Sequence, residues 1–333
     1  MSLPATPVSA VAPLAALAIA VALDLAVAEP PARVHPVALF GSVVERVDRE
    51  WARPGLAGGA AAGGLPLLAA AVAGGTVRAA AGVGPRVGVD PRPLAVPVAG
   101  ALLFSTVSLR MLRDVTAEVV ALTESDPDAA RESVRALVGR DAADLSPAAL
   151  RSAAVESAAE NLADGFVAPL AGFAAGATVG LAVAPATPLP LAGGVAGAAW
   201  VKAVNTLDSM LGYRSKPVGR ASARLDDAVM YLPARATAGC LAVAAGSIGT
   251  LSRARSWARE PASPNSGWPM ATAAAALDVR LAKPEHYALN PTAAAPSVAD
   301  AERAVRLVGV AGGVAVAGTA GWLAAVAGVV AWS

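Results

Sequence analysis

The sequence predicts an all-α fold, a polytopic integral membrane helix bundle with amphipathic helices and loops at one membrane face. Two observations predict this fold. Of the 333 residues, 56% are hydrophobic and only 15% are charged, whereas a soluble domain usually carries about 25% charged residues. The hydrophobic residues also fall into runs close to the roughly 20 residues that a helix needs to cross a bilayer. Because so little polar surface would not keep the chain dispersed in water, we expect it to lie in a membrane.

Seven apolar runs are candidates for membrane-spanning helices. The first lacks the basic stretch of a signal peptide, because MSLPATPVSA carries no charged side chain, so we expect a retained helix. In the fourth run, Gly172, Gly176 and Gly180 recur at helical spacing. They would allow close packing between membrane helices, or they simply reflect a chain rich in Ala and Gly. The runs cover residues 11–28, 56–77, 94–109, 166–184, 189–204, 229–251 and 307–332.

Four polar segments carry most of the charge, and we expect them at one face of a single membrane-embedded domain (1–333). In the second, DPDAARESVRALVG predicts a helix that Asp126 caps and Gly139 ends. A second helix is expected from the cap Ser146 to near Gly165. The polar segments cover residues 29–54, 110–164, 205–227 and 252–306.

The sixth apolar run, 229–251, disturbs the expected topology. If all seven runs cross, the segment that starts at Ser252 falls on the opposite side from the other three. Pro233 and Arg235 also lie inside the start of this run. We therefore expect the run to be re-entrant or half-buried. Because Arg-rich loops usually face the cytoplasm, we expect a multi-pass protein of the cell membrane with its active face cytoplasmic.

The stretch from Asn205 to Asp227 reads NTLDSMLGYRSKPVGRASARLDD and concentrates charge between two apolar runs. Its adjacent carboxylates, Asp226 and Asp227, are expensive to desolvate beside a membrane unless they bind a divalent cation or pair with nearby arginines. Mg²⁺ typically binds one or two protein carboxylates together with nucleotide phosphate oxygens. The stretch therefore predicts a polyphosphate site. Lys202, just before it, would join the site or merely snorkel to the membrane interface.

A stripe of acidic side chains lies on the helix expected after Ser146. Glu156, Glu160 and Asp164 recur every four residues and so share one helix face, with Asn161 beside them. Like charges repel at this spacing, and the last two carboxylates sit at the expected helix C-terminus, where the macrodipole disfavours anions. The pattern predicts that a cation, a metal or a donor-rich ligand compensates the charge. The alternative is a solvated acidic face.

Other features exclude several classes of site. The net charge is +1 and no basic face stands out, so we expect no nucleic acid partner. The single cysteine, Cys240, excludes an internal disulfide, and the sequence has no P-loop, HExxH or nucleophile-elbow motif. His35 precedes a proline, which favours an extended backbone. Trp268, in the turn-rich SPNSGWP, would stack on a planar ligand or anchor the chain at the membrane interface.

Six motifs, taken together and in order, resemble one family, the CobD/CbiB membrane proteins of cobalamin biosynthesis. The resemblance spans nearly the whole chain, from LDLAVAEPPARVHPV to DAERAVRLVGV. This chain departs from the family pattern with AEP at 28–30 in place of a frequent GDP, with Ala142 in place of a Thr after GRD, and with EPA in place of a His before SPN. The six motifs are HPVALFG, GRDAADLSP, ESAAENLADGFVAPL, KAVNTLDSMLGY, ASARLDDAVMYLPAR and SPNSGWP.

The resemblance implies adenosylcobinamide-phosphate synthase activity, an ATP-dependent ligation that forms a carbon–nitrogen (amide) bond. Adenosylcobyric acid would be joined through its free propionate to (R)-1-amino-2-propanol O-phosphate, or to the free aminoalcohol. ATP and Mg²⁺ are the expected cofactors. The expected partners are adenosylcobyric acid, aminopropanol phosphate, membrane lipid and other late-stage enzymes of cobalamin biosynthesis.

The chemistry of such a ligase suggests roles for the candidate residues. A carboxylate does not condense with an amine in water unless it is activated, so we expect phosphorylation to an acyl phosphate and then attack by the amine. We expect catalytic roles for Glu160, Asp208 and Lys202, and metal binding by Glu156, Asp226 and Asp227. Substrate binding is expected from His35, Asn161, Asp164, Asn205, Tyr213, Arg214, Ser222, Arg224, Asn265 and Trp268.

Two other classes of function compete with the ligase. An intramembrane prenyl- or alcohol-phosphate transferase also uses aspartates that face Mg²⁺, but such enzymes show D-x-x-x-D arrangements, whereas this chain has adjacent Asp226 and Asp227. A corrinoid or metal-ion transporter would place polar residues in the middle of its spans. Here nearly all charge lies at the ends of the apolar runs or between them, which favours chemistry at the membrane surface.

Overall fold

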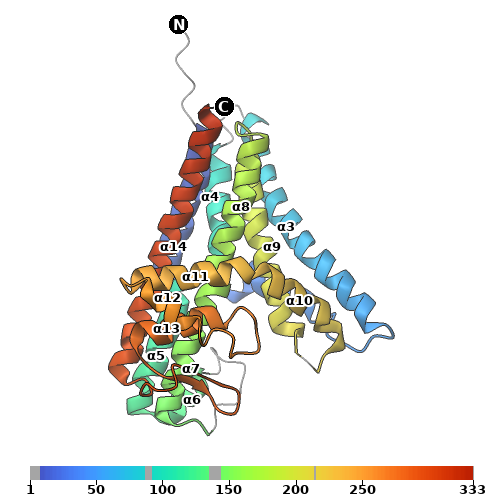
Figure 1. Cartoon of the computed structure of the whole chain (residues 1–333). Helices are drawn as coiled ribbons and strands as arrows, with labels where there is room; N and C mark the ends of the chain where they lie inside the picture. Colours follow the sequence, from blue (N-terminus) through green and yellow to red (C-terminus); the bar gives the residue numbers. More distant parts are fainter. Residues whose placement is uncertain (1–7, 87–91, 135–143, 214, 333) are drawn as a thin grey trace. The chain divides into compact units, whose positions relative to one another are not determined.

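The computed structural model describes residues 8–86, 92–134, 144–213 and 215–332. These residues are helical apart from loops and one short hairpin, which confirms the predicted all-α membrane helix bundle (Figure 1). Contacts divide the chain into two compact units, each assembled from separate stretches of sequence. The first unit comprises Met1–Ser108, Ala168–Val229 and Val316–Ser333, and the second Leu109–Val167 and Met230–Ala315. That they act as the single domain expected from the sequence stays a prediction.

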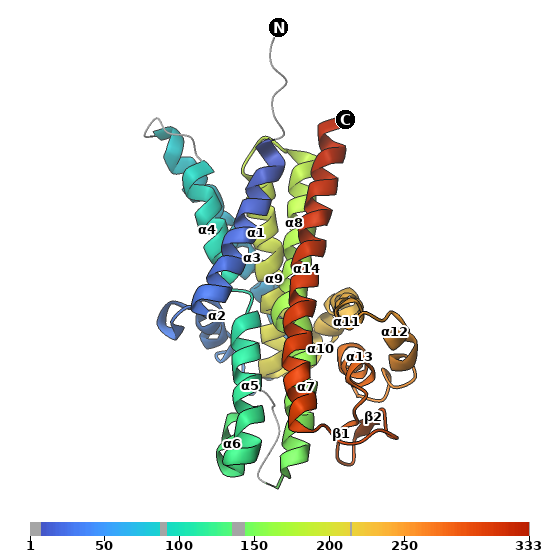
Figure 2. The same cartoon turned by 90° about the vertical axis from the view of Figure 1, so that its left-hand side faces the viewer.

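The first unit consists mainly of long apolar helices. They are α1 (Val8–Val27), α2 (Pro36–Val44), α3 (Pro54–Arg86), α4 (Arg92–Phe104), α8 (Ala168–Val183), α9 (Leu189–Leu211), α10 (Arg220–Val229) and the C-terminal part of α14 (Val298–Trp332). Helix α9 packs against both α8 and α3, and α1 lies beside α4 (Figure 2). The Trp322 Nε1–H of α14 donates a 2.9 Å hydrogen bond to Thr178 Oγ1 of α8.

Glycines bring the backbones of α8 and α9 together. A Cβ atom on Gly176 would overlap the carbonyl oxygen of Gly193, and one on Gly172 would overlap that of Gly197. A Cβ on Gly180 would likewise overlap the backbone of Pro190. The glycine spacing seen in the sequence is therefore a packing stripe, as expected for helices that associate in lipid through close van der Waals contact.

The second unit consists of shorter helices around its own core. They are α5 (Leu109–Ser125), α6 (Pro127–Val134), α7 (Pro147–Leu162), a π-helical turn (Ala163–Val167), α11 (Tyr231–Ala244), α12 (Gly249–Ala254), α13 (Gly267–Leu277) and the N-terminal part of α14. Buried Met270 of α13 and Val155 of α7 belong to the core cluster, with Leu281 and Leu289 from a hairpin. That hairpin pairs β1 (Leu281–Lys283) with β2 (Tyr287–Leu289) in antiparallel register, Lys283 opposite Tyr287.

Four stretches are long and apolar enough to cross a membrane among the described residues: Pro54–Val83, Leu94–Ser125, Pro147–Val183 and Val298–Trp332. They contain the second, third, fourth and seventh of the predicted runs. The first run forms the shorter apolar helix Val11–Val27. The fifth forms α9, which is helical over 23 residues but includes Lys202 and Asn205 and is less apolar than the four.

The sixth run does not form one helix. Helix α11 has 14 residues, so it is about 21 Å long, and a membrane core is about 30 Å thick. Gly246 ends it with a φ of +66°: its N–H donates to Val243 O, and the Ser247 N–H donates to Ala242 O, which is a Schellman motif. A single crossing over 229–251 is therefore excluded by length. The re-entrant placement of this run stays a prediction.

The predicted helix starts in the polar region are confirmed. Asp126 Oδ1 accepts a 3.0 Å hydrogen bond from Ala129 N ahead of α6, and Ser146 Oγ accepts one of 3.3 Å from Ala149 N at the start of α7. Gly139, the predicted end of the first helix, lies outside the described residues. The expected end near Gly165 is wrong, because the chain continues through the π-helical turn into α8. Gly165 is buried there, and packing against neighbours keeps the turn helical.

Candidate functional site

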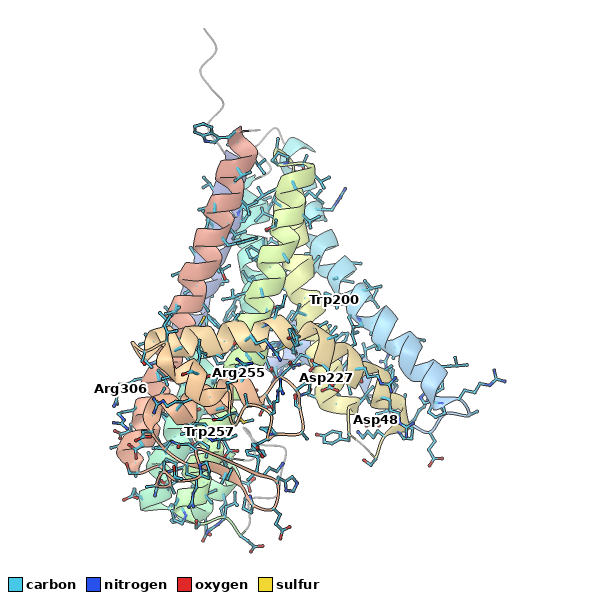
Figure 3. The ribbon with its side chains drawn as sticks, viewed as in Figure 1. Asp48, Trp200, Asp227, Arg255, Trp257 and Arg306 are labelled. Carbon is cyan, nitrogen blue, oxygen red and sulfur yellow. The ribbon has the colours of Figure 1, made fainter. Side chains whose placement is uncertain are left out.

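Helix α10 presents one charged face because its apolar residues pack against the first unit. Ala221 and Leu225 pack against a core cluster that includes buried Leu207 of α9. Arg224 and Asp227 are exposed, and Figure 3 labels Asp227. Helix α10 also packs directly against α9, so the two halves of the stretch 205–227 are brought together by the fold.

Asp208 occupies an unfavourable position in the last turn of α9. Its Oδ1 atom is buried and has no hydrogen-bond partner among the described residues. Burial raises the pKa of Asp208, and the nearby Asp227 carboxylate raises it further. The C-terminal end of a helix disfavours an anion as well. Burial also raises the pKa of Asp227. Two carboxylates held together against these penalties are typical of a site that binds a cation or handles a proton.

Other side chains of this stretch serve the local structure. The Lys216 ammonium lies 2.6 Å from Asp48 Oδ2 and donates to Met210 O, which satisfies a carbonyl at the end of α9. Tyr213 is 53% exposed, and the Lys216 ammonium lies 5.3 Å from its ring centroid. The Ser222 hydroxyl is buried and donates to Gly219 O. Arg214 lies outside the described residues, and the predicted substrate roles of Tyr213, Ser222 and Arg214 stay predictions.

His35 and Lys202 lie close enough to influence each other in the first unit. His35 is extended, as the following proline predicts, and its Nδ1 accepts a 3.2 Å hydrogen bond from Val37 N that caps α2. Burial lowers the pKa of His35; Glu29 opposes this effect and the Lys202 charge adds to it. Asn205 lies half-buried three residues after Lys202 on α9, on the same face. Their substrate and catalytic roles stay predictions.

Glu156 of α7, in the second unit, is a fully satisfied buried carboxylate. It is 4% exposed. Its Oε1 accepts a 2.7 Å hydrogen bond from Ser152 Oγ, and its Oε2 accepts one of 2.6 Å from Tyr287 OH. Ser152 Oγ in turn accepts a 2.9 Å bond from Ala282 N. Glu156 therefore fastens the hairpin to α7, and its predicted role as a metal ligand stays a prediction.

Glu160 lies one turn further along the same stripe. The charges of Asp164, Glu156 and Lys283 all act on its carboxylate, and Lys283 is the one of opposite sign. Lys283 comes from β1, so the hairpin brings a cation to the acidic stripe, as the sequence predicted some partner would. Asn161 donates to Ser157 O at 3.0 Å and to Ser157 Oγ at 2.9 Å, and thus its amide N–H groups bond to its own helix.

The SPNSGWP loop is fixed by an arginine from α11. The Arg235 guanidinium lies 3.5 Å from the Tyr231 ring centroid and 5.4 Å from that of Trp268. Its Nη1 donates a 3.0 Å hydrogen bond to Asn265 Oδ1. Asn265 is buried, and Trp268 packs against the core of the second unit. The arginine therefore positions Asn265 and Trp268, the two residues of this loop that were predicted to bind substrate.

The carboxylates of α10 are compatible with a cation that also binds phosphate oxygens. Within residues 8–86, 92–134, 144–213 and 215–332, no three His, Cys, Asp or Glu side chains lie close enough to hold a metal ion. Mg²⁺, however, is commonly bound through one or two carboxylates and substrate phosphates. Asp226 and Asp227, adjacent on α10, provide oxygen ligands of that kind.

Three residues with a role in these clusters were missed from the sequence. Lys283 and Tyr287 lie in KPEHYALN, which shows no catalytic motif, and Arg235 looked like an obstacle to a membrane span. Only the pairing of distant segments reveals them. The Asp208 pair belongs to the first unit and the Glu160 stripe to the second. The expectation that both line one pocket stays a prediction.

A model of the CobD/Cbib protein family matches residues 17–315. The chain belongs to the CobD/CbiB family. Relatives named cobalamin biosynthesis protein CobD include those of Rhodobacter capsulatus, 38% identical over 82% of this chain and 84% of the relative, and Mycobacterium tuberculosis, 36% identical over 83% and 85%. The probable CobD of Methanothrix thermoacetophila is 35% identical over 84% and 87%. No solved structure matches this CobD/CbiB chain.

Proposed function

We infer that the chain works in cobalamin biosynthesis, and we propose that it is an adenosylcobinamide-phosphate synthase. The observation that carries this proposal is the pair of carboxylates Asp208 and Asp227, held together beside the cations of α10 in a chain of this family. The proposed reaction joins adenosylcobyric acid to (R)-1-amino-2-propanol O-phosphate, or to the free aminoalcohol, with ATP as the activating substrate.

The proposed reaction has two steps. The free propionate of adenosylcobyric acid attacks the γ-phosphorus of ATP, which forms an acyl phosphate and releases ADP. The amine of the aminoalcohol then attacks the acyl carbon, the carbon–oxygen bond to phosphate breaks, and inorganic phosphate leaves. The nitrogen loses its proton to a base, which leaves the amide.

The residues of the first unit are suited to the first step. Asp227 and Asp226 would hold Mg²⁺, which neutralises charge on the transferring phosphoryl group when it is bound. Arg224 on the exposed face of α10 binds phosphate oxygens. This contact orients the nucleotide so that its γ-phosphate meets the propionate.

Two carboxylates are candidates for the base of the second step. Asp208 has a raised pKa and a buried oxygen without a hydrogen-bond partner among the described residues, so it accepts a proton more readily than an ordinary aspartate. Glu160 is the second candidate, and Lys283 balances part of its charge. The amine must be deprotonated before or during attack, because an ammonium has no lone pair.

The proposal is tested with purified protein, adenosylcobyric acid, aminopropanol phosphate and Mg-ATP. Mass spectrometry of the corrinoid should show the mass of the amide, with one ADP released per amide formed. Asp227→Asn should lower turnover by more than about tenfold, and turnover within about tenfold of wild type would contradict the role of Asp227. A corrinoid of unchanged mass would overturn the ligase; its accumulation inside sealed vesicles would indicate a transporter instead.

A further inference from the structure

A cavity of about 360 Å³ lies within the first unit, apart from the charged face of α10. Helices α2, α3, α4 and α9 provide its walls, with Phe40, Leu65, Leu102 and Val195 as representative side chains. This volume lies in the range of pockets that hold small molecules. The walls are almost entirely apolar, whereas the corrinoid acid, the aminoalcohol phosphate and ATP of the proposed reaction are strongly polar. The cavity therefore suits a different ligand.

The hydroxyl groups in the walls do not change this apolar character. Thr76 donates to Val72 O at 2.8 Å, and Thr206 donates to Lys202 O at 2.8 Å. Ser105 and Thr106 also donate to carbonyls of their own segment. Because a hydroxyl has one donor proton, these four groups have already used it. A ligand meets mainly their methyl and methylene groups and the surrounding hydrocarbon.

Lys202 is the one charged side chain among the residues that line the cavity. Its aliphatic stem can lie along apolar walls while its ammonium attracts an anion. A ligand that complements this cavity therefore has a long apolar part and one negative group. Those two properties together describe an anionic amphiphile.

The cavity opens on a surface that belongs in hydrocarbon. Its wall on α3 lies in the membrane-span candidate Pro54–Val83, whose most apolar window is only 22% buried within the protein. Leu68 and Val72 line the cavity and are still 57% and 61% exposed. Such exposure is unfavourable in water but ordinary beside acyl chains. A lipid can thus enter from the bilayer without crossing a polar barrier.

We propose that this cavity binds an anionic phospholipid, with an acyl chain between α3 and α9 and the headgroup phosphate at Lys202. The lipid is a structural ligand of the first unit and is not consumed in the reaction. Its binding does not depend on the proposed ligase activity, and its test measures bound lipid rather than amide formation.

The test uses the full chain in vesicles that contain equal amounts of phosphatidylcholine and phosphatidylglycerol. Native mass spectrometry of the protein after release into detergent should show retained phosphatidylglycerol in excess of phosphatidylcholine. Lys202→Met keeps the apolar stem and removes the charge, so it should lower phosphatidylglycerol retention about fivefold. Phosphatidylcholine retention should not change.

A matched pair of variants on α3 distinguishes lipid bound in the cavity from lipid bound elsewhere on the protein surface. Ala73 lines the cavity, and Ala73→Phe should fill it and lower retention roughly tenfold or more. Ala71 is exposed and is not among the lining residues, and Ala71→Phe should retain lipid like the wild type. If Ala73→Phe does not fold, Ala199→Leu on the α9 wall provides the same test.

Three results would overturn the proposal. Equal retention of the two lipids by the wild type would show that Lys202 does not select an anionic headgroup. Equal retention by Ala73→Phe and Ala71→Phe would show that the lipid binds elsewhere. Displacement of the bound lipid by adenosylcobyric acid would assign the cavity to the substrate.

Discussion

Two carboxylates that were predicted to belong to the site, Glu156 of α7 and Asp208 of α9, have opposite environments in the structure. Glu156 is more deeply buried, yet both of its oxygens accept hydrogen bonds, from Ser152 and Tyr287. Asp208 is less buried, but its Oδ1 has no such partner among the described residues and Asp227 lies beside it. Hydrogen-bond satisfaction, rather than depth of burial, therefore separates a structural carboxylate from one available to a ligand.

The largest expected effect comes from changing the unsatisfied carboxylate. Asp208→Asn should lower the rate of amide formation about a hundredfold or more, because it removes a proton acceptor without changing the shape of the side chain. The measurement is turnover of the purified protein with saturating substrates. Asp48→Asn is the control, since it removes an equivalent charge from the exposed pair with Lys216 and should cost less than about fivefold. A comparable loss in both variants would contradict the assignment.

The satisfied carboxylate should instead show a loss of stability. Tyr287→Phe removes the donor to Glu156 Oε2 and leaves a buried carboxylate oxygen unpaired, so it should lower the free energy of unfolding by about 1–3 kcal/mol. Thermal unfolding in detergent measures this. Tyr213→Phe, at a 53% exposed tyrosine, should leave the Tm unchanged. An unchanged Tm in Tyr287→Phe would mean that Glu156 does not depend on this bond.

A smaller effect is expected at the cap of α2. His35→Ala removes the acceptor for Val37 N and should destabilise the protein by about 1 kcal/mol, the usual loss for a helix cap. His35→Asn retains a capping acceptor and should restore most of that stability. If substrate affinity falls equally in both variants while only the alanine variant is less stable, His35 also binds substrate. If both variants bind substrate normally, His35 serves only as a cap.

The smallest effect is a pH-dependent change of stability at Asp208. Its pKa is raised from an ordinary value of 3.8, so folding favours the protonated form. The protonated Asp208 carboxyl therefore contributes to the stability of the wild type. This contribution is complete below pH 3.8 and is lost as the pH rises through the folded-state pKa. The amide of Asp208→Asn does not ionise, so this variant does not lose the contribution and should be more stable than the wild type at neutral pH. Thermal unfolding of both proteins across this range measures the difference, and a constant difference at every pH would contradict the raised pKa.

Features that depend on neighbouring residues were predictable from the amino-acid sequence. Four of the seven apolar runs that were predicted to span the membrane fall in long membrane-type helices. Ser146 and Asp126 predicted helix starts, and close helix packing was one of two interpretations of the glycine spacing, the one that the contact between α8 and α9 supports. Hydrophobic periodicity and capping act over a few residues, which is why they can be read directly. The sequence failed at Gly165, where packing keeps the chain helical although a glycine usually ends a helix.

The contacts between charged side chains became known from the folded structure. Tyr287 lies 131 positions from Glu156, and the hairpin that carries it also brings Lys283 to Glu160. The contact of α10 with α9 likewise brings Asp227 close enough to influence the charge of Asp208. The partners of these charged side chains lie far away in the sequence and are brought together by the fold, so no local sequence pattern predicts them. The same limit explains why the cavity at Lys202 had no signal in the sequence, since its walls come from four helices.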